Sequence, residues 1–425
     1  NFVASGTLGS GVTVALKTDG TVSVVSATGS TIGETIPTGS AVVFNSGSSE
    51  HPLVAYDPNT ANKFVVCYRD TTNSQYGTAV VGTVSGTSIS FGSEYVFNSA
   101  TTNYTSVAFD PSTAGKFVVV YTDTGNSSYG TAIVGTVSGT AISFGSEYVF
   151  KTSSSYECSL SFDLNTTGKF VVSYSDAGNS YYGEAVVGTV SGTTISFGTP
   201  VVYFSGSTYY ASVAYDPNTA NKCVVTYVNN SGAPDPGTAR VGTVSGTAIS
   251  FSSPYVYSNN DTVYAVLSFD PNTANKFVVA YRDNTNSSYG TAIIGTVSGT
   301  SISYGTAVVF NSGSTHWPSV SFDPNQAGKL VIVYADAGNS SYGTAIVGTV
   351  SGTSISFGSE LVFNSGNTIP TISFDPNTSG KFVIAYKDQT IDNGAAILGQ
   401  LAATLSNNTD FIGITDAAIS SAASG

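Results

Sequence analysis

Aromatic, imidazole and carboxylate side chains recur at two adjacent positions of this 425-residue sequence, roughly every 53 residues. These positions, here called the mouth column and the adjacent column, contain both histidines and the only tryptophan of the chain. Aromatic faces beside hydrogen-bonding groups suit stacking on a sugar ring or gripping a peptide. The mouth column is His51, Tyr104, Glu157, Tyr210, Tyr264, Trp317 and Ile369, and the adjacent column is Glu50, Asn103, Tyr156, Tyr209, Val263, His316 and Thr368.

A second series of residues, all with oxygen atoms in their side chains, recurs in the sequence with the same period. These oxygens offer either ligands for Ca²⁺ or acceptors that cap a turn. The flanking turns are rich in Gly, Asn and Ser, but they lack the dense Asp and Asn alternation of a dedicated calcium site. We therefore predict turn caps, expect no cofactor, and keep Ca²⁺ as the alternative. The series is Asp70, Asp123, Asp176, Asp283, Asp336 and Asp388, with Asn229 in the remaining position.

All of these residues are copies within one internal repeat. Its anchor is Asp57-Pro58-Asn59, and the equivalent aspartates follow at intervals of 53, 53, 53, 54, 53 and 52 residues. Such regular spacing indicates a repeat architecture. Proline presets φ for a turn and the aspartate side chain accepts from nearby amides, so we predict that the anchor shapes a turn. The anchor aspartates are Asp57, Asp110, Asp163, Asp216, Asp270, Asp323 and Asp375.

Each repeat contains four runs with the composition of β-strands. In the fifth repeat these runs are 266–269, 277–281, 289–297 and 301–310. They are rich in Val, Ile, Phe, Tyr and Thr, and Gly, Asn, Asp and Ser bound them. A period near 50 with four strands is typical of a β-propeller blade, and a parallel β-helix is the alternative. We predict an all-β, seven-bladed β-propeller built from four-stranded repeats.

The order of the runs also predicts how the ring closes. A fourth-strand run at 41–44 precedes the first anchor, and the last repeat ends after its third strand, near 395–399. An N-terminal strand that completes the last blade would bury both free edges. We therefore expect residues near 33–45 to complete the blade formed by residues 371–402.

The domain prediction follows from this closure. The propeller is predicted at 33–402, an N-terminal extension with a β-hairpin at 1–32, and an exit segment leading to a further module at 403–425. The chain begins at Asn1 and contains no methionine, so we expect a portion of a longer precursor.

The two columns precede the first strand of each repeat, and we expect their side chains to crowd the central opening. This gives a predicted ligand-binding site, with the alternative that the aromatic rings only fill the channel. The predicted site residues are Glu50, His51, Tyr104, Tyr156, Glu157, Tyr209, Tyr210, Tyr264, His316 and Trp317.

Bulk composition argues against two classes of partner. The net charge of −13 and the even spread of the few basic residues argue against binding a nucleic-acid backbone. No apolar run approaches the roughly 18–20 residues of a transmembrane helix, so no membrane insertion is expected. The three cysteines, odd in number and irregularly spaced, are uninformative about a disulfide framework. Cys67 and Cys223 are predicted to be small core residues.

Catalysis would require an asymmetric cluster of acid, base or nucleophile. Glycosidases use a pair of carboxylates. Here Glu50 and Glu157 are two repeats apart, with Asp261 before the fifth anchor, and no zinc, phosphate or serine-hydrolase motif occurs. We therefore expect a non-catalytic protein, with a propeller glycosidase as the alternative.

Three segments carry a resemblance to known proteins. Residues 289–300 (YGTAIIGTVSGT), 408–418 (NTDFIGITDAA) and 14–22 (VALKTDGTV) resemble segments of virion and tail-fibre-like proteins of marine bacteriophages, and the repeats also resemble bacterial surface proteins. The resemblance of the repeats covers residues 40–400 and supplies no catalytic residues. It implies a virion or cell-surface appendage, on the virion surface or extracellular, that contacts other appendage subunits and binds a glycan or a surface protein receptor. A secreted bacterial lectin or adhesin is the alternative.

Overall fold

The computed structural model describes residues 39–401 and the backbone of five strands outside that range. The chain divides into two compact units, residues 36–400 and a smaller unit of residues 1–35 with 401–425. In the smaller unit, β2 and β3 pair antiparallel, as the hairpin prediction requires, and β32 pairs with β2. The rest of the predicted extension (1–32) and exit segment (403–425) lies outside the described residues. The five strands are β1 (Val3–Ala4), β2 (Thr13–Leu16), β3 (Thr21–Val24), β4 (Glu34–Thr35) and β32 (Phe411–Ile414).

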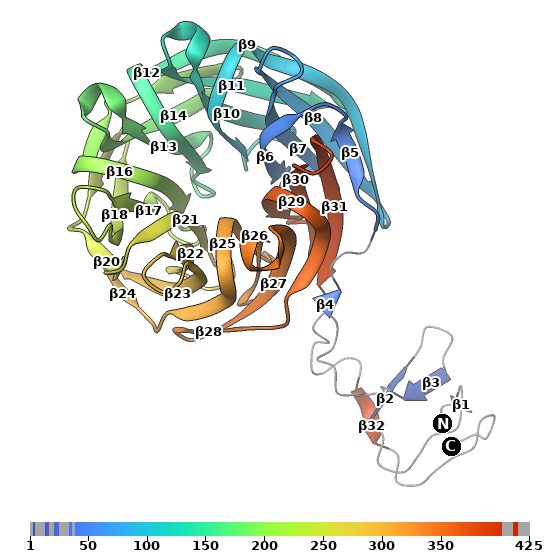
Figure 1. The fold of residues 1–425 in the computed structure, drawn as a ribbon. Helices are drawn as coiled ribbons and strands as arrows, with labels where there is room; N and C mark the ends of the chain where they lie inside the picture. The colour runs from blue at the N-terminus through green and yellow to red at the C-terminus, as the bar shows by residue number, and fades with distance from the viewer. Residues whose placement is uncertain are drawn as a thin grey trace. The chain divides into compact units, whose positions relative to one another are not determined.

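The larger unit repeats one antiparallel arrangement of strands around a central opening (Figure 1). In the fifth repeat the strands are β21 (Thr262–Phe269), β22 (Lys276–Asp283), β23 (Tyr289–Ser298) and β24 (Ser301–Tyr304). Each pairs antiparallel with the next. β22 is almost entirely buried, because side chains on both of its faces meet neighbouring sheets. The first three predicted runs of this repeat therefore lie in strands, and the fourth is divided between β24 and the start of β25 (Val308–Phe322).

The remaining strands of the larger unit occupy equivalent positions in the other repeats. They are β5 (Val42–Asn45), β6 (Ser49–Tyr56), β7 (Lys63–Asp70), β8 (Tyr76–Ser85), β9 (Ser88–Phe109), β10 (Lys116–Asp123), β11 (Tyr129–Ser138), β12 (Ala141–Phe162), β13 (Lys169–Asp176), β14 (Tyr182–Ser191), β15 (Thr194–Phe197), β16 (Val201–Tyr215), β17 (Lys222–Asn229), β18 (Gly237–Ser245), β19 (Ala248–Phe251), β20 (Tyr255–Ser258), β25 (Val308–Phe322), β26 (Lys329–Asp336), β27 (Tyr342–Ser351), β28 (Ser354–Phe357), β29 (Leu361–Phe374), β30 (Lys381–Asp388) and β31 (Asn393–Leu401).

The outermost strand does not end within its own repeat, and on this point the sequence prediction was wrong. The fourth run of the fifth repeat was expected to end at Phe310, but β25 continues from Val308 to Phe322. Gly313 lies within this stretch and has no positive φ, so the backbone stays extended there. The outer strand of one repeat and the inner strand of the next are therefore one continuous strand in β25, as in β9, β12, β16 and β29, whereas β5 and β6, and β20 and β21, are separate strands.

The core lies between neighbouring sheets. One cluster joins Val65 of β7 to Phe97 and then to Phe117 and Tyr121 of β10, so it spans two successive repeats. Full burial of each such side chain contributes about 1.5–3 kcal/mol. Gly135 permits the close approach, because a Cβ there would overlap the Phe117 ring. Cys67 and Cys223 are buried among these apolar side chains, as predicted.

The anchor aspartate shapes its turn, as predicted, and also joins neighbouring repeats. Asp57 Oδ1 accepts from the amide of Asn59 at 2.9 Å, while Asp57 Oδ2 accepts from the amide of Gly115 at 2.8 Å. The turn and the contact between repeats therefore use the two oxygens of one carboxylate.

The first and last repeats are in contact. β5 pairs antiparallel with β31, with Val43 opposite Ala395. The amide of Tyr56 donates to Ser373 Oγ at 3.2 Å. Successive repeats are joined by the same kind of bond, for example from the amide of Leu160 to Ser106 Oγ at 3.1 Å.

Helical structure is confined, within residues 39–401, to three short 3-10 turns. They are η1 (Thr124–Asn126), η2 (Ala177–Asn179) and η3 (Ala337–Asn339). None of the described helices has the length and apolarity required to cross a membrane.

Candidate functional site

β-Bulges place the mouth column. Six of its seven residues have φ between 47° and 55°, and the pairing register with the second strand shifts at each of them. From the sequence we expected these residues at the start of the innermost strand, but they lie inside it. A bulge adds one residue to one strand and re-aims a side chain. The six residues are His51, Tyr104, Glu157, Tyr210, Tyr264 and Trp317.

Ile369 is the exception, and the sequence explains why. β29 pairs with β30 through Thr368, Ile369 and Pro370 without a register shift. The interval between the last two anchors, Asp323 and Asp375, is 52 residues, one fewer than the usual 53. The missing residue is therefore the bulge itself.

The bulges hold large side chains in a backbone region that glycine normally occupies. For other L-residues the left-handed region costs about 1–2 kcal/mol each. Bulky residues adopt it rarely, and such outliers cluster at ligand sites. The column therefore stores strain at each bulge while directing its side chains into the opening.

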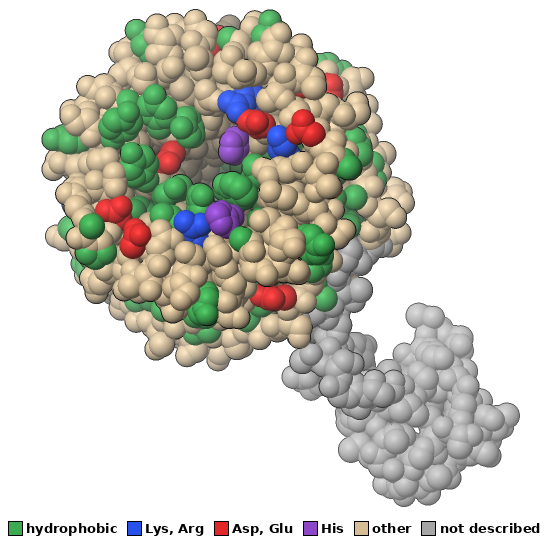
Figure 2. Space-filling view, in the orientation of Figure 1, with side chains coloured by type: hydrophobic (Ala, Val, Ile, Leu, Met, Phe, Trp, Pro, Cys, Tyr) green, Lys and Arg blue, Asp and Glu red, His purple; other side chains and the backbone are tan. Residues whose placement is uncertain are grey.

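The mouth column lines a cavity of about 580 Å³ at one end of the central opening. Figure 2 shows this hollow, with hydrophobic side chains gathered along one part of its rim and charged side chains along another. All seven mouth-column residues line it, whereas Asn103 is the one adjacent-column residue that does so. Three residues of the adjacent column, Tyr156, Tyr209 and His316, contact rings of the mouth column.

Aromatic rings lie along part of the rim in two groups of contacting rings; we call the two groups together the aromatic arc. Ring centroids of Tyr104 and Tyr156 are 5.2 Å apart, and those of Tyr210 and Tyr264 are 5.0 Å apart. The Trp317 ring lies 6.1 Å from Tyr264. These are the spacings of edge-to-face and tilted aromatic pairs. The arc consists of Tyr104, Tyr156, Tyr181, Tyr209, Tyr210, Tyr264, His316 and Trp317.

Glu157 is the carboxylate among the residues that line the cavity. It accepts from the backbone amides of Tyr210 and Ala211. Burial raises the pKa of Glu157 to about 7, and these amide bonds offset part of that effect. Within residues 39–401 it forms no ion pair. Near neutral pH this carboxyl group is therefore poised between its two protonation states.

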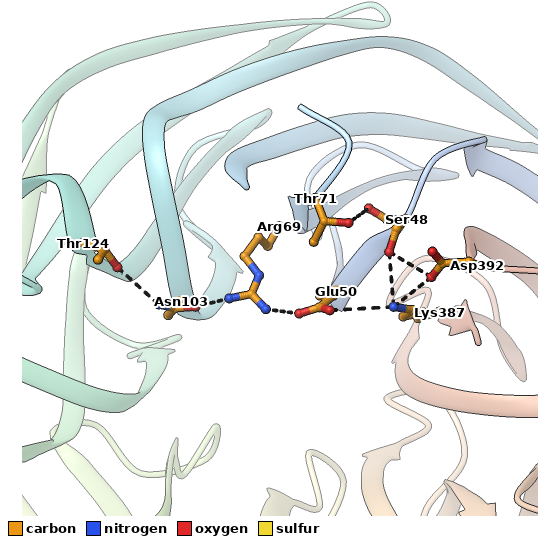
Figure 3. A network of polar contacts seen from close by, with 8 residues as sticks. All are labelled: Ser48, Glu50, Arg69, Thr71, Asn103, Thr124, Lys387 and Asp392. Carbon is orange, nitrogen blue, oxygen red and sulfur yellow. Dashed lines mark hydrogen bonds and ion pairs between the residues drawn. The ribbon is translucent and has the colours of Figure 1, made fainter. Parts of the chain in front are cut away.

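A polar network occupies another part of the rim (Figure 3). Glu50 forms an ion pair with Arg69 and lies 3.8 Å from Lys387 Nζ. Lys387 Nζ lies 3.0 Å from Asp392, and Arg69 donates to Asn103. The network thus joins side chains of the first, second and last repeats. Its other members are Ser48, Thr71 and Thr124.

The two histidines occupy different surroundings. His51 lines the cavity, and burial followed by the charge of Lys387 lowers its pKa. His316 lies 3.3 Å from Arg282, and burial followed by the Arg282 charge lowers its pKa. Arg282 also lies over the ring of Tyr264, with its Cζ 5.0 Å from the centroid. Both imidazoles are therefore neutral hydrogen-bonding groups at pH 7.

The cations of the rim were not predicted from the sequence. Arg69, Arg282 and Lys387 each immediately precede a member of the acidic series. In the structure they face Glu50, Val263 and Ile369 across the first two strands. The signal was present, because three of the seven residues at this position are basic.

The acidic series caps turns. Asp123, Asp176 and Asp336 each accept from the amide two residues later, at 3.0, 2.9 and 2.9 Å, and so begin the three 3-10 turns. The described part of the chain contains no group of three His, Cys, Asp or Glu side chains suited to a metal ion. The capping prediction is confirmed for these residues.

The opposite end of the opening has a different lining. A cavity of about 420 Å³ there is bordered by prolines of the anchor turns and by large apolar side chains. Leu164 stands where other anchors have proline and is 53% exposed. This end offers apolar surface but none of the charged groups found at the mouth.

No family model matches the sequence, and no curated protein sequence matches it. Solved structures of similar fold do exist. The BP39L lectin from Burkholderia pseudomallei superposes with a TM-score of 0.64 at 9% identity, over 85% of this chain and 99% of that chain. Sqt1 from Chaetomium thermophilum gives 0.51 at 13% identity, over 86% and 85%. Sqt1 from Saccharomyces cerevisiae gives 0.52 at 9% identity, over 86% and 98%. Likeness at these identities is one of fold, and it shows that this chain is an all-β repeat protein of the β-propeller kind.

Proposed function

We propose that this chain is a non-catalytic binding propeller that recognises a glycan through the aromatic arc at its mouth. The observation that carries the proposal is the conjunction of arc and bulges. Large rings are held at strained backbone positions around a cavity of about 580 Å³. Strain of this kind persists where a site requires it, and exposed aromatic faces suit the apolar faces of sugar rings.

The setting we propose is a virion or cell-surface appendage, on the virion surface or extracellular. Its support is the resemblance of the repeats to tail-fibre-like and bacterial surface proteins. Other appendage subunits are then partners, and a surface protein is the second kind of receptor. No nucleic acid and no membrane insertion enter the proposal.

A secreted bacterial lectin or adhesin is the second candidate. The BP39L lectin of similar fold favours it, with a TM-score of 0.64. Both candidates use the same mouth, so they differ in the larger assembly and not in the chemistry of recognition.

We infer that the chain is non-catalytic from the arrangement of its two glutamates at the mouth. Glu50 is engaged by Arg69 and Lys387, whereas Glu157 is held by backbone amides. A glycosidase needs two carboxyl groups that face one bond from opposite sides. A carboxylate already paired with two cations is a weak base, so Glu50 is poorly suited to that role.

A glycan array tests the proposal with three proteins. The unmodified chain is expected to bind a subset of glycans, and the Trp317→Ala, Tyr210→Ala variant to lose that binding. Leu164→Ala, at the opposite end of the opening, is the matched control and should bind as the unmodified chain does. Equal binding by the first two proteins, or loss in the control alone, would contradict a sugar site at the mouth.

We also propose that the ring has seven blades and that β5 completes the last of them. Three contacts support this: the pairing of β5 with β31, the bond from Tyr56 to Ser373, and the network from Lys387 to Glu50. Removing residues 1–45 should lower the melting temperature strongly, because it exposes the edge of β31. Removing residues 1–38 is the control and should leave β5 in place. Equal melting temperatures for the two truncations would refute the closure.

A further inference from the structure

The mouth contains one negative charge without a positive partner. Glu157 is the acidic residue among the side chains that line the cavity. The basic residue lining it is Arg69, which Glu50 already engages. Among the described residues no lysine, arginine or histidine forms an ion pair with Glu157.

The groups that face Glu157 are neutral. Tyr104 of β9, Cys158 of its own strand, and Tyr203 and Tyr210 of β16 interact with it, and burial is the main factor that raises the pKa of each. Tyr156 and Tyr181 lie beyond Tyr104 in the arc. Two basic groups adjoin the arc: Arg69, which interacts with Tyr104 and is engaged by Glu50, and Arg282, which stands over Tyr264 and beside His316. The carboxylate therefore sits among aromatic rings without compensation.

Aromatic rings and a carboxylate favour the same kind of ligand group. The face of a tyrosine ring is electronegative and attracts a cation within about 6 Å of its centroid. The carboxylate adds a full charge and charge-assisted hydrogen bonds. The chain as a whole is acidic, at −13, which draws cations toward it.

We propose, building on the glycan-binding function above, that the mouth selects a sugar carrying a positively charged amino group, with the ammonium against Glu157 and the apolar face of the sugar on the arc. Neutral sugars then retain the stacking but lack the ion pair. Glu157 then determines the selectivity for charged over neutral sugars, and the rings of the arc provide the affinity for both.

This arrangement links binding to pH. A cation favours the ionised carboxyl group, so the protonated form, held by the raised pKa of about 7, must lose its proton on binding. For a ligand with a permanent trimethylammonium group, the ionised fraction of Glu157 sets the affinity. That fraction rises from about 0.1 at pH 6 to about 0.9 at pH 8, an approximately tenfold gain.

The test is isothermal titration of the full chain with a glucosamine tetramer and with its N-acetylated counterpart, which has the same sugar frame without charge. The unmodified chain is expected to bind the charged form at least tenfold more tightly. Glu157→Gln should abolish this preference and keep binding of the neutral form, because the amide still accepts from the Tyr210 amide. Trp317→Ala should weaken both. Tetralysine at equal charge controls for attraction by the net charge of the protein.

Several outcomes overturn the proposal and separate it from the proposed function. Equal affinity for the two tetramers, an unchanged preference in Glu157→Gln, or equal binding of tetralysine refutes the ammonium site. If neutral glycans still bind and require Trp317, the glycan-binding function stands alone. If no sugar binds to a folded chain, both proposals fail. Should Glu157→Gln not fold, the pH series with the trimethylammonium tetramer decides: affinity that is flat from pH 6 to pH 8 refutes the role of Glu157.

Discussion

Replacing Tyr104 by glycine and by alanine measures the strain held at a bulge. Its φ of 47° lies in the left-handed region, which costs an alanine about 1–2 kcal/mol and glycine almost nothing. Both substitutions remove the same ring, so the lost contact with Tyr156 cancels between them. The matched control is the same pair of substitutions at Ile369, where no bulge occurs.

The expected result is a reversal of order between the two positions. Glycine has greater freedom in the unfolded chain, which lowers stability by about 0.5–1 kcal/mol relative to alanine at either position. At Ile369 this effect accounts for the whole difference in stability between the two variants, so the alanine variant is the more stable. At Tyr104 the relief of backbone strain exceeds this unfolded-state effect, so the glycine variant is the more stable. The double difference isolates the strain at about 1–2 kcal/mol.

Calorimetric melting of the four variants provides the measurement. If the unit of residues 36–400 unfolds as a whole, the double difference in stability corresponds to a difference of about 1–3 °C in melting temperature. Tyr210, with φ of 52°, is a second test position and should behave as Tyr104 does. The same order at all three positions, with alanine always more stable, would refute the strain argument.

Lys151→Asn alone is expected to cost about 3 kcal/mol, because it leaves the buried Glu184 unpaired, whereas Lys151→Asn with Glu184→Thr should melt near the unmodified chain. Lys151 also contacts Asp176, and although burial raises the pKa of Asp176, hydrogen bonds that include one from Lys151 lower it overall. The stabilisation of the fold by ionised Asp176 is therefore present above about pH 4 and is lost as the pH falls further. The loss of stability caused by Lys151→Asn should accordingly be smaller when melting is measured at acid pH. Tyr121→Phe should cost about 1 kcal/mol in the same assay, because its hydroxyl donates to a glutamate at 2.8 Å. Tyr257→Phe should cost nothing, because its buried hydroxyl has no partner among the described residues.

Much of the fold was predictable because its signals are local. Turn residues around Asp270, runs of β-branched and aromatic residues and a nearly constant interval indicated the strands of each repeat, and β21 to β23 form at those places. The outer strand was misjudged, because the fourth run was expected to end at Phe310, whereas the backbone stays extended through Gly313. A glycine permits a turn but does not require one.

The candidate site was predictable in outline. The mouth column was identified from its period, and all of its members line the cavity. The bulge was not identified, although the 52-residue interval before Asp375 records its absence from the last repeat. Arg69 and Lys387 were not predicted, because they lie on the second strand of their repeats, whereas both columns lie on the first.

Local sequence patterns are sufficient to indicate the repeat, the strand composition and the residues at equivalent positions, because turn chemistry and strand-forming composition act within a few residues of the chain. Which of those residues contact one another depends on the packing of the repeats. Glu50 lies 19 residues from Arg69 in sequence yet pairs with it, while Glu157, from an equivalent region two repeats later, accepts from backbone amides and forms no ion pair among the described residues. Such differences arise from contacts between neighbouring strands and neighbouring repeats, in which side-chain orientations are set by bulges and by the packing of neighbouring sheets.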